Sequence, residues 1–259
     1  MTFAFDTGRL SDVGRVRQVN EDAALALPEC GLWVVADGMG GHSAGDVAAG
    51  MVVDALASTG MAVGADDLVA RVSDRLTQAN DAIRAHAAAG GLGTIGATVV
   101  ALLVAEDGAR AVWSGDSRLY RLREGRLTLM TRDHTEVNAL IDSGALTSEE
   151  AAGYPRRNVI TRAIGVSEVP ELEVREVAVE PGDMWLLCSD GLTEHLEDDD
   201  IQRLMAAATP QAACGALVAL TLERGARDNV TVVAVGIARH QASDPVPEDV
   251  PLEGIIPDV

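Results

Sequence analysis

The strand-like segments of this chain come in groups and do not alternate strictly with the helical segments. Apolar runs typical of β-strands lie at 32–37, 97–106, 109–116, 175–190 and 229–238, and the run 118–131 indicates a hairpin around Glu124 and Gly125. Helical periodicity appears at 44–58, 66–89, 136–143, 199–207 and 210–224. This grouping favours antiparallel sheets covered by helices over a doubly wound parallel sheet. We therefore expect an α+β fold.

The composition is that of a soluble protein with a large core. The 259 residues are 47% hydrophobic, yet no apolar run approaches the roughly 18 to 20 residues that a membrane span needs. The first residues do not have the pattern of a signal peptide. Cys30, Cys188 and Cys214 lie far apart, which indicates core thiols in a reducing compartment. We expect a cytoplasmic protein.

The charged residues exclude several classes of function. A net charge of −20 would repel nucleic acids and anionic membranes, so we expect neither as a partner. All 20 basic residues are arginine, and the chain contains no lysine. A P-loop, a protein kinase and a Schiff-base enzyme each need a lysine. A nucleotide-binding kinase or ATPase is therefore disfavoured.

A glycine-rich stretch joins an apolar run to a helical pattern. It reads VVADGMGGHSAGDVAAG over residues 34–50, and the acid Asp37 with Gly38 stands where the apolar run ends. Ser43 and Asp46 match a capping box, so we expect the helix to begin there. Two interpretations remain at this point: the backbone binds a phosphate, or the acid binds a metal.

Four acids share a position at the edge of a predicted strand, beside glycine or another turn-forming residue. The acids are Asp37, Asp116, Asp190 and Asp228. Their carboxylates would gather at the rim of a sheet and provide the oxygen ligands that Mg²⁺ and Mn²⁺ prefer. Each one alone has a plainer interpretation as a turn residue.

The segment SDVGRVRQVNEDA, residues 11–23, adds a possible phosphate-binding arginine and two further acids. Arg17, with Arg15 as the alternative, offers bidentate contacts to phosphate, and Glu21 and Asp22 follow it.

The ordered set GRVRQVNED, VVADGMGGHSAGD, GDSRLYRL, LLCSDGL and RDNVTVVAV resembles the metal-dependent serine/threonine protein phosphatases of type 2C, in their compact bacterial form. The resemblance runs from about residue 5 to residue 238. It implies a four-layer α/β-β/α sandwich of two antiparallel sheets flanked by helices. It also implies a catalytic domain over 1–240 with a flap at about 134–164. The proline-rich acidic tail 241–259 is expected to be disordered.

The resemblance assigns a role to each candidate residue. Asp37 would bridge two metal ions, Gly38 would offer its carbonyl oxygen, and Asp190 and Asp228 would complete the ligands of the first ion. Glu21 and Asp22 would act through metal-bound waters, and Asp116 with Asp190 would hold a third, looser ion. Arg17 would bind the substrate phosphate. His42 would act as the general acid, with capping of the following helix as its alternative role.

These roles imply hydrolysis of phosphoserine and phosphothreonine in proteins by a water that bridges two Mn²⁺ or Mg²⁺ ions. The expected partners are phosphorylated proteins, including a serine/threonine kinase or its substrates, and the expected state is a monomer. The sequences of these motifs are most similar to those of phosphatases that oppose a kinase controlling a bacterial secretion apparatus. The alternative is a catalytically weak module that binds phosphoproteins on the same scaffold.

Overall fold

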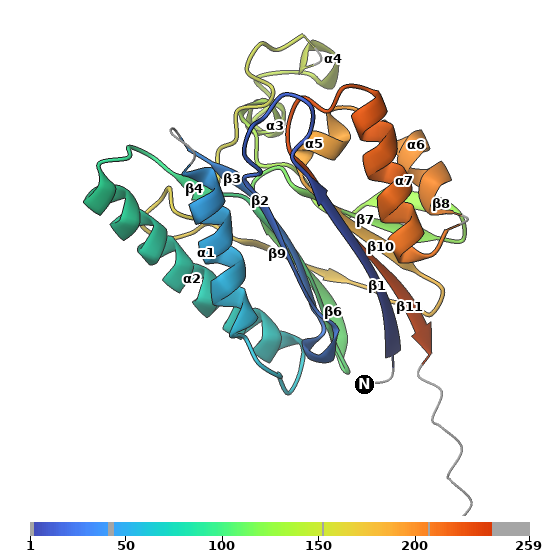
Figure 1. Cartoon of the computed structure of the whole chain (residues 1–259). Helices are drawn as coiled ribbons and strands as arrows, with labels where there is room; N and C mark the ends of the chain where they lie inside the picture. Colours follow the sequence, from blue (N-terminus) through green and yellow to red (C-terminus); the bar gives the residue numbers. More distant parts are fainter. Residues whose placement is uncertain (1–2, 41–43, 152, 207, 240–259) are drawn as a thin grey trace, which may run out of the picture.

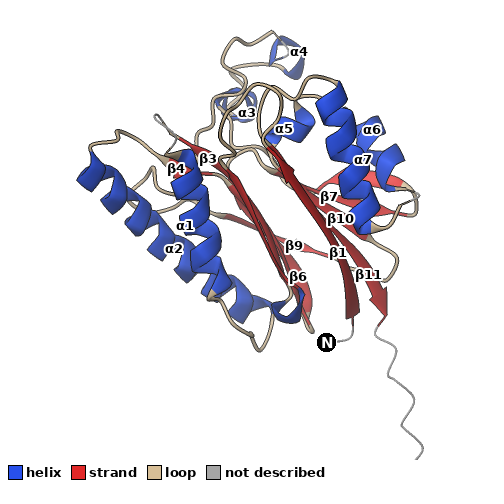
Figure 2. Cartoon of the chain, viewed as in Figure 1, coloured by secondary structure: helices blue, strands red, loops and turns tan. Residues whose placement is uncertain are grey.

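The computed structural model describes residues 3–40, 44–151, 153–206 and 208–239. Two antiparallel sheets pack face to face, and helices cover both outer faces (Figures 1 and 2). The predicted α+β four-layer sandwich is thereby confirmed. None of the helices in the described ranges combines the length and apolar character that a membrane span requires.

One sheet has six strands and the other has five. The six-stranded sheet runs in the order β2 (Asp22–Leu27), β3 (Leu32–Met39), β5 (Val99–Ala105), β6 (Gly108–Ser114) and β9 (Glu173–Val177), with β4 (Gly96–Ala97) paired to β3. The five-stranded sheet runs in the order β1 (Phe3–Asp12), β11 (Val230–Arg239), β10 (Met184–Cys188), β7 (Arg118–Arg123) and β8 (Arg126–Leu129).

The helices divide between the two outer faces. On the six-stranded sheet lie α1 (Gly45–Ala57) and α2 (Ala65–Gly90), and on the five-stranded sheet lie α6 (Asp198–Met205) and α7 (Pro210–Glu223). Two short helices follow strands: η1 (Pro28–Cys30) comes after β2, and α5 (Asp190–Thr193) comes after β10. The predicted flap segment 134–164 carries α3 (Glu136–Asp142) and α4 (Ser148–Ala151) above the strand ends (Figure 1).

The apolar core has three layers because each sheet buries both of its faces. One cluster lies under α1 and α2, a second between the sheets, and a third under α6 and α7. The middle cluster contains Trp33, Trp113 and Trp185, all fully buried, as the sequence predicts. All three cysteines are free, and Cys188 and Cys214 are buried.

The structure corrects two details of the predicted elements. β1 and β2 are strands that the periodicity does not indicate: β1 contains Gly8 in a polar stretch, and β2 is rich in alanine and leucine. Helix α1 begins at Gly45 with Ala44 at the N-cap position and no side-chain cap. The predicted capping box, which needs Ser43 at that position, is therefore wrong, and Ser43 itself lies outside the described residues.

Candidate metal centre

The predicted acids gather at one rim of the sandwich, and both sheets contribute to it. From the six-stranded sheet, Asp37 lies near the end of β3, opposite Asp22 in the ladder, and Asp116 follows β6. From the five-stranded sheet, Asp190 begins α5 directly after β10, and Asp228 precedes β11. The packing of the two sheets therefore brings together residues that are far apart in the sequence.

Two hydrogen bonds to Thr98 hold the backbone of Asp37 in place. Its N–H donates to Thr98 Oγ1 over 3.1 Å, and its carbonyl oxygen accepts from Thr98 N over 2.8 Å. The next residue must be glycine, because a Cβ at Gly38 would lie 2.0 Å from Gly45 O. The rim end of β3 thus packs directly against the start of α1.

Asp22 has one satisfied and one unsatisfied carboxylate oxygen. Ser189 Oγ donates to Asp22 Oδ2 over 2.8 Å. Asp22 Oδ1 is buried and has no hydrogen-bond partner among the residues that the structure describes. A buried acceptor without a donor is costly, and a cation or its bound water is one way to satisfy it.

Arg17 and Asp228 form an ion pair at the same rim. Arg17 Nη2 lies 2.6 Å from Asp228 Oδ2, and Asn229 N donates to Asp228 Oδ1 over 2.8 Å. The Arg17 side chain is about half exposed, so it is accessible to a ligand. The main-chain N–H of Arg15 donates to Ala226 O. Of the two candidate arginines, Arg17 is the one whose side chain contacts an acid of the rim.

Burial, and then the charges of neighbouring carboxylates, raises the pKa values of the acids at this rim. Burial, followed by the charges of Asp22 and Asp190, raises the pKa of Asp37 well above its usual value. Burial, followed by the charges of Asp116 and Glu194, raises the pKa of Asp190 to about 8. Such raised values mean that ionising these buried, neighbouring carboxyl groups is unfavourable without a positive charge beside them. A divalent cation would supply that charge.

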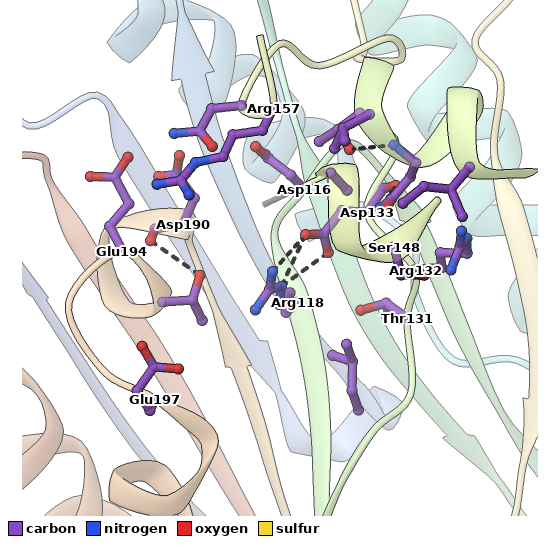
Figure 3. Close-up of a pocket in the computed structure, with 18 of the residues that line it drawn as sticks. Asp116, Arg118, Thr131, Arg132, Asp133, Ser148, Arg157, Asp190, Glu194 and Glu197 are labelled. Atoms are coloured by element: carbon purple, nitrogen blue, oxygen red, sulfur yellow. Dashed lines mark hydrogen bonds and ion pairs between the residues drawn. The ribbon is translucent and has the colours of Figure 1, made fainter. Parts of the chain in front are cut away.

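The pKa values of two other acids of the rim are raised less. Burial raises the pKa of Asp22 to about 6. Burial, and then the charge of Asp133, raises the pKa of Asp116 to about 6. Asp133 itself forms an ion pair with Arg118, in which Arg118 Nη2 lies 2.8 Å from Asp133 Oδ2 (Figure 3).

The residues fit divalent cations in chemistry, and some of their oxygens also accept hydrogen bonds from the protein. Among the residues that the structure describes, no three His, Cys, Asp or Glu side chains converge at metal-ligand spacing. Both oxygens of Asp228 accept a hydrogen bond, one from Arg17 Nη2 and one from Asn229 N. Each carboxylate oxygen has two lone-pair sites, so these bonds leave room for a cation. The hard oxygen donors and the unpaired Asp22 Oδ1 suit Mg²⁺ or Mn²⁺.

A cavity of about 830 Å³ opens beside this rim. Asp116, Asp190 and Glu194 line it, and the segment 134–164 forms much of the opposite wall. Arg157 extends from that segment toward Asp190 (Figure 3). The cavity thus leads from the carboxylates outward between α5 and the predicted flap.

The remaining predicted residues have separate outcomes. Glu21 lies at the rim, where its Oε1 accepts from Gly45 N over 3.1 Å at the start of α1. His42 lies outside the described residues. Sequence reasoning missed the polar residues that hold the acids, among them Thr98, Ser189 and Asn229. Only the adjacency of Ser189 to Asp190, and of Asn229 to Asp228, offers a signal for them.

Comparison with known proteins agrees with this geometry. The family pattern of protein phosphatase 2C matches residues 14–219. The serine/threonine protein phosphatase PstP of Mycobacterium tuberculosis is 42% identical over 234 residues, which is 89% of this chain and 44% of PstP. The chain thus spans less than half the length of that relative.

Two solved structures have the same fold. One is described as PppA, a key regulatory component of T6SS in Pseudomonas aeruginosa; it has a TM-score of 0.82 and 42% identity over 90% of this chain and 97% of that one. The other is the catalytic domain of PstP in complex with two manganese ions, with a TM-score of 0.80 and 38% identity over 92% of this chain and 100% of that one.

Proposed function

This chain belongs to the protein phosphatase 2C family, and we propose that it hydrolyses phosphoserine and phosphothreonine in proteins with the help of divalent metal ions. The observation that carries the proposal is the rim of mutually repelling acids, with Asp37 at its centre and Arg17 beside it. Carboxylates that raise one another's pKa are suited to cations, and an accessible arginine is suited to a phosphate.

Asp37, the Gly38 carbonyl, Asp190 and Asp228 would hold the metal ions in this proposal. Glu21 and Asp22 would act through water, and Asp116 with Asp190 would hold a further ion. When bound, Mn²⁺ or Mg²⁺ neutralises charge on the phosphoryl group and makes a water more acidic near neutral pH. The two manganese ions in the PstP catalytic domain support this choice of cofactor.

The protein residues supply binding and orientation. Arg17 would bind the phosphoryl oxygens, because the guanidinium matches phosphate in a bidentate manner. His42 is the candidate for protonating the seryl or threonyl oxygen that leaves, on the strength of the sequence pattern. A phosphate monoester resists hydrolysis strongly, so a barrier reduction of more than about 20 kcal/mol is required.

The substrate in this proposal is a polypeptide, and the cavity beside the rim receives it. The flap segment 134–164 and α5 form its two walls. Charged residues such as Glu194 and Arg157 line it, which suits contacts with the chain around the phosphorylated residue. The likeness to PppA supports a phosphoprotein of a secretion system, including its kinase, as the target.

The test measures release of phosphate from a phosphothreonine peptide with Mn²⁺, with excess chelator, and with Asp190→Asn. We expect turnover to require Mn²⁺ and to fall at least about 100-fold in the variant, as for loss of a group that binds a catalytic ion. Asp54→Asn, which changes an exposed acid of α1, is the control and should retain activity. A folded, Mn²⁺-binding protein without turnover would contradict the proposal and favour the phosphoprotein-binding module.

A further inference from the structure

The side chain of Asn229 makes three hydrogen bonds to a single loop. Its Nδ2 donates to Val13 O over 2.9 Å and to Val19 O over 3.0 Å, and its Oδ1 accepts from Glu21 N over 2.8 Å. Both N–H donors and the carbonyl oxygen are therefore used. Asn229 is 4% exposed, so these bonds form in a site that largely excludes water.

The loop between these anchors carries Arg17. Val13 and Val19 bracket it, and the loop side chains between them are largely exposed, with Val16 66% exposed. Burial of those side chains therefore contributes little to the position of the loop. Hydrogen bonds to the main chain of the loop hold it in position instead. Asn229 supplies bonds at both ends, and Arg15 N adds one to Ala226 O.

The same residue also orients the partner of Arg17. Asn229 N donates to Asp228 Oδ1, while Asp228 Oδ2 meets Arg17. The loop packs against this backbone closely enough that a Cβ at Gly14 would lie 2.3 Å from Asp228 O. Asn229 thus sets the position of the arginine loop relative to the acid that Arg17 contacts.

We propose that Asn229 is a positioning residue, which holds the loop 13–21 so that the Arg17 guanidinium stands over the carboxylate rim where the phosphoryl oxygens of the substrate bind. This inference rests on the proposed function. Loss of the Asn229 side chain keeps the Arg17 guanidinium in the protein but lets its loop move away from the carboxylate rim. Phosphate binding then weakens, because part of the contact energy is spent on ordering the loop.

A buried amide also stabilises a fold, and the chain contains a matched control for that effect. Asn80 in α2 is fully buried and makes the same three kinds of bond. Its Oδ1 accepts from Gly165 N over 2.7 Å, and its Nδ2 donates to Ser167 O and Glu168 O over 3.1 and 3.4 Å. Asn80 therefore anchors a different loop with an equal number of hydrogen bonds.

The experiment is a double-mutant cycle of Asn229→Ala with Arg17→Ala, read out as kcat and KM on a phosphothreonine peptide with saturating Mn²⁺. We expect Asn229→Ala alone to raise KM by about tenfold with less than about a threefold change in kcat. In the Arg17→Ala background the same substitution should change kcat/KM by less than about twofold, because the positioned group is absent. Asn80→Ala should lower the melting temperature comparably and have the same effect in both backgrounds.

Equal effects of Asn229→Ala with and without Arg17, or an effect confined to kcat, would overturn the inference. If Asn229→Ala does not fold, Asn229→Ser, which keeps a small polar side chain, takes its place in the cycle. Binding of the phosphopeptide to the Mn²⁺-loaded proteins, measured by fluorescence anisotropy, gives the same comparison without turnover. Absence of turnover in the wild type would thus count against the proposed function, while equal peptide affinity of wild type and Asn229→Ala would count against this inference.

Discussion

At the scale of single residues, the site depends on which carboxylate oxygens have hydrogen-bond donors and which do not. Asp228 is fully engaged, and Asp22 is engaged through one oxygen only. Burial, and then the charges of neighbouring acids, raises the pKa values of Asp37 and Asp190. Asp37 and Asp190 therefore weaken the folded state when they ionise without a cation, and a bound cation would reverse that effect.

The first prediction concerns pH and Asp190. Its pKa is about 8 in the folded chain and 3.8 as an ordinary carboxyl. Between those values the folded state keeps a proton that the unfolded state releases, so stability falls as pH rises through this window and levels off above it. We expect, in chelator, a lower melting temperature at pH 8 than at pH 6, and a larger rise on adding Mn²⁺ at pH 8.

Asp190→Asn removes this penalty. In chelator at pH 8 the variant should melt above the wild type while lacking activity. The control Asp54→Asn changes net charge equally from an exposed position and should leave the melting temperature nearly unchanged. A variant that melts below the wild type under these conditions would contradict the assignment.

The acids were predictable from the sequence, whereas the groups that hold them were not. An acid next to glycine at the end of an apolar run, such as Asp37 or Asp190, is a local pattern. Ser189 and Asp22 are 167 residues apart, and Thr98 and Asp37 are 61 apart. The Ser189 hydroxyl meets Asp22 only after the two sheets have packed, and the Thr98 hydroxyl meets Asp37 only after β3 has paired with β4 and β5, so no local pattern marks either bond.

At the scale of elements, local signals succeed where an element carries its own boundaries. Helix α7 was predicted over 210–224 and is found at Pro210–Glu223, because Thr209 caps it and Pro210 occupies the first turn. Strand β1 was missed because its pairing with β11, over all ten of its residues, determines its conformation. Its polar centre around Gly8 carries no period-two pattern.

The second prediction uses that same glycine. A Cβ at Gly8 would lie 2.3 Å from Gln211 N at the start of α7, so the strand and the helix would have to separate. We expect Gly8→Ala to destabilise the protein by about 1–3 kcal/mol, as overpacking does. Gly50→Ala, within α1 where a Cβ meets nothing within 4 Å, should instead stabilise by about 0.5–1 kcal/mol. Urea unfolding of both variants tests the pair, and equal effects would contradict it.

At the scale of the whole molecule, the packing of the two sheets decides whether the rim forms at all. Trp33 in the six-stranded sheet donates its Nε1–H to Thr7 Oγ1 in the five-stranded sheet over 3.0 Å. It also meets Phe5 edge-on, with ring centroids 4.8 Å apart. Trp185 is equally buried, but its Nε1–H has no hydrogen-bond partner within the described part of the chain.

The third prediction compares these tryptophans. Trp33→Phe removes a hydrogen bond between the sheets and leaves Thr7 without its donor. Trp185→Phe removes an unpaired polar group together with a similar volume. We therefore expect Trp33→Phe to lower the free energy of unfolding by about 1–2 kcal/mol more than Trp185→Phe does. Chemical denaturation of both variants in Mn²⁺ measures the difference, and the reverse order would show that the bond to Thr7 does not matter.

The pairing of β1 with β11 has one more consequence. Phe3 lies opposite Arg239 in the ladder, at the end of the sandwich away from the acidic rim (Figure 1). A short peptide that joined these two residues would close the backbone into a ring without crossing the catalytic face. The chain is therefore suited to circular permutation, with new termini in the exposed turn at Glu124 and Gly125 between β7 and β8. A reporter domain fused beyond Arg239 would likewise be tethered at the opposite pole from the acidic rim.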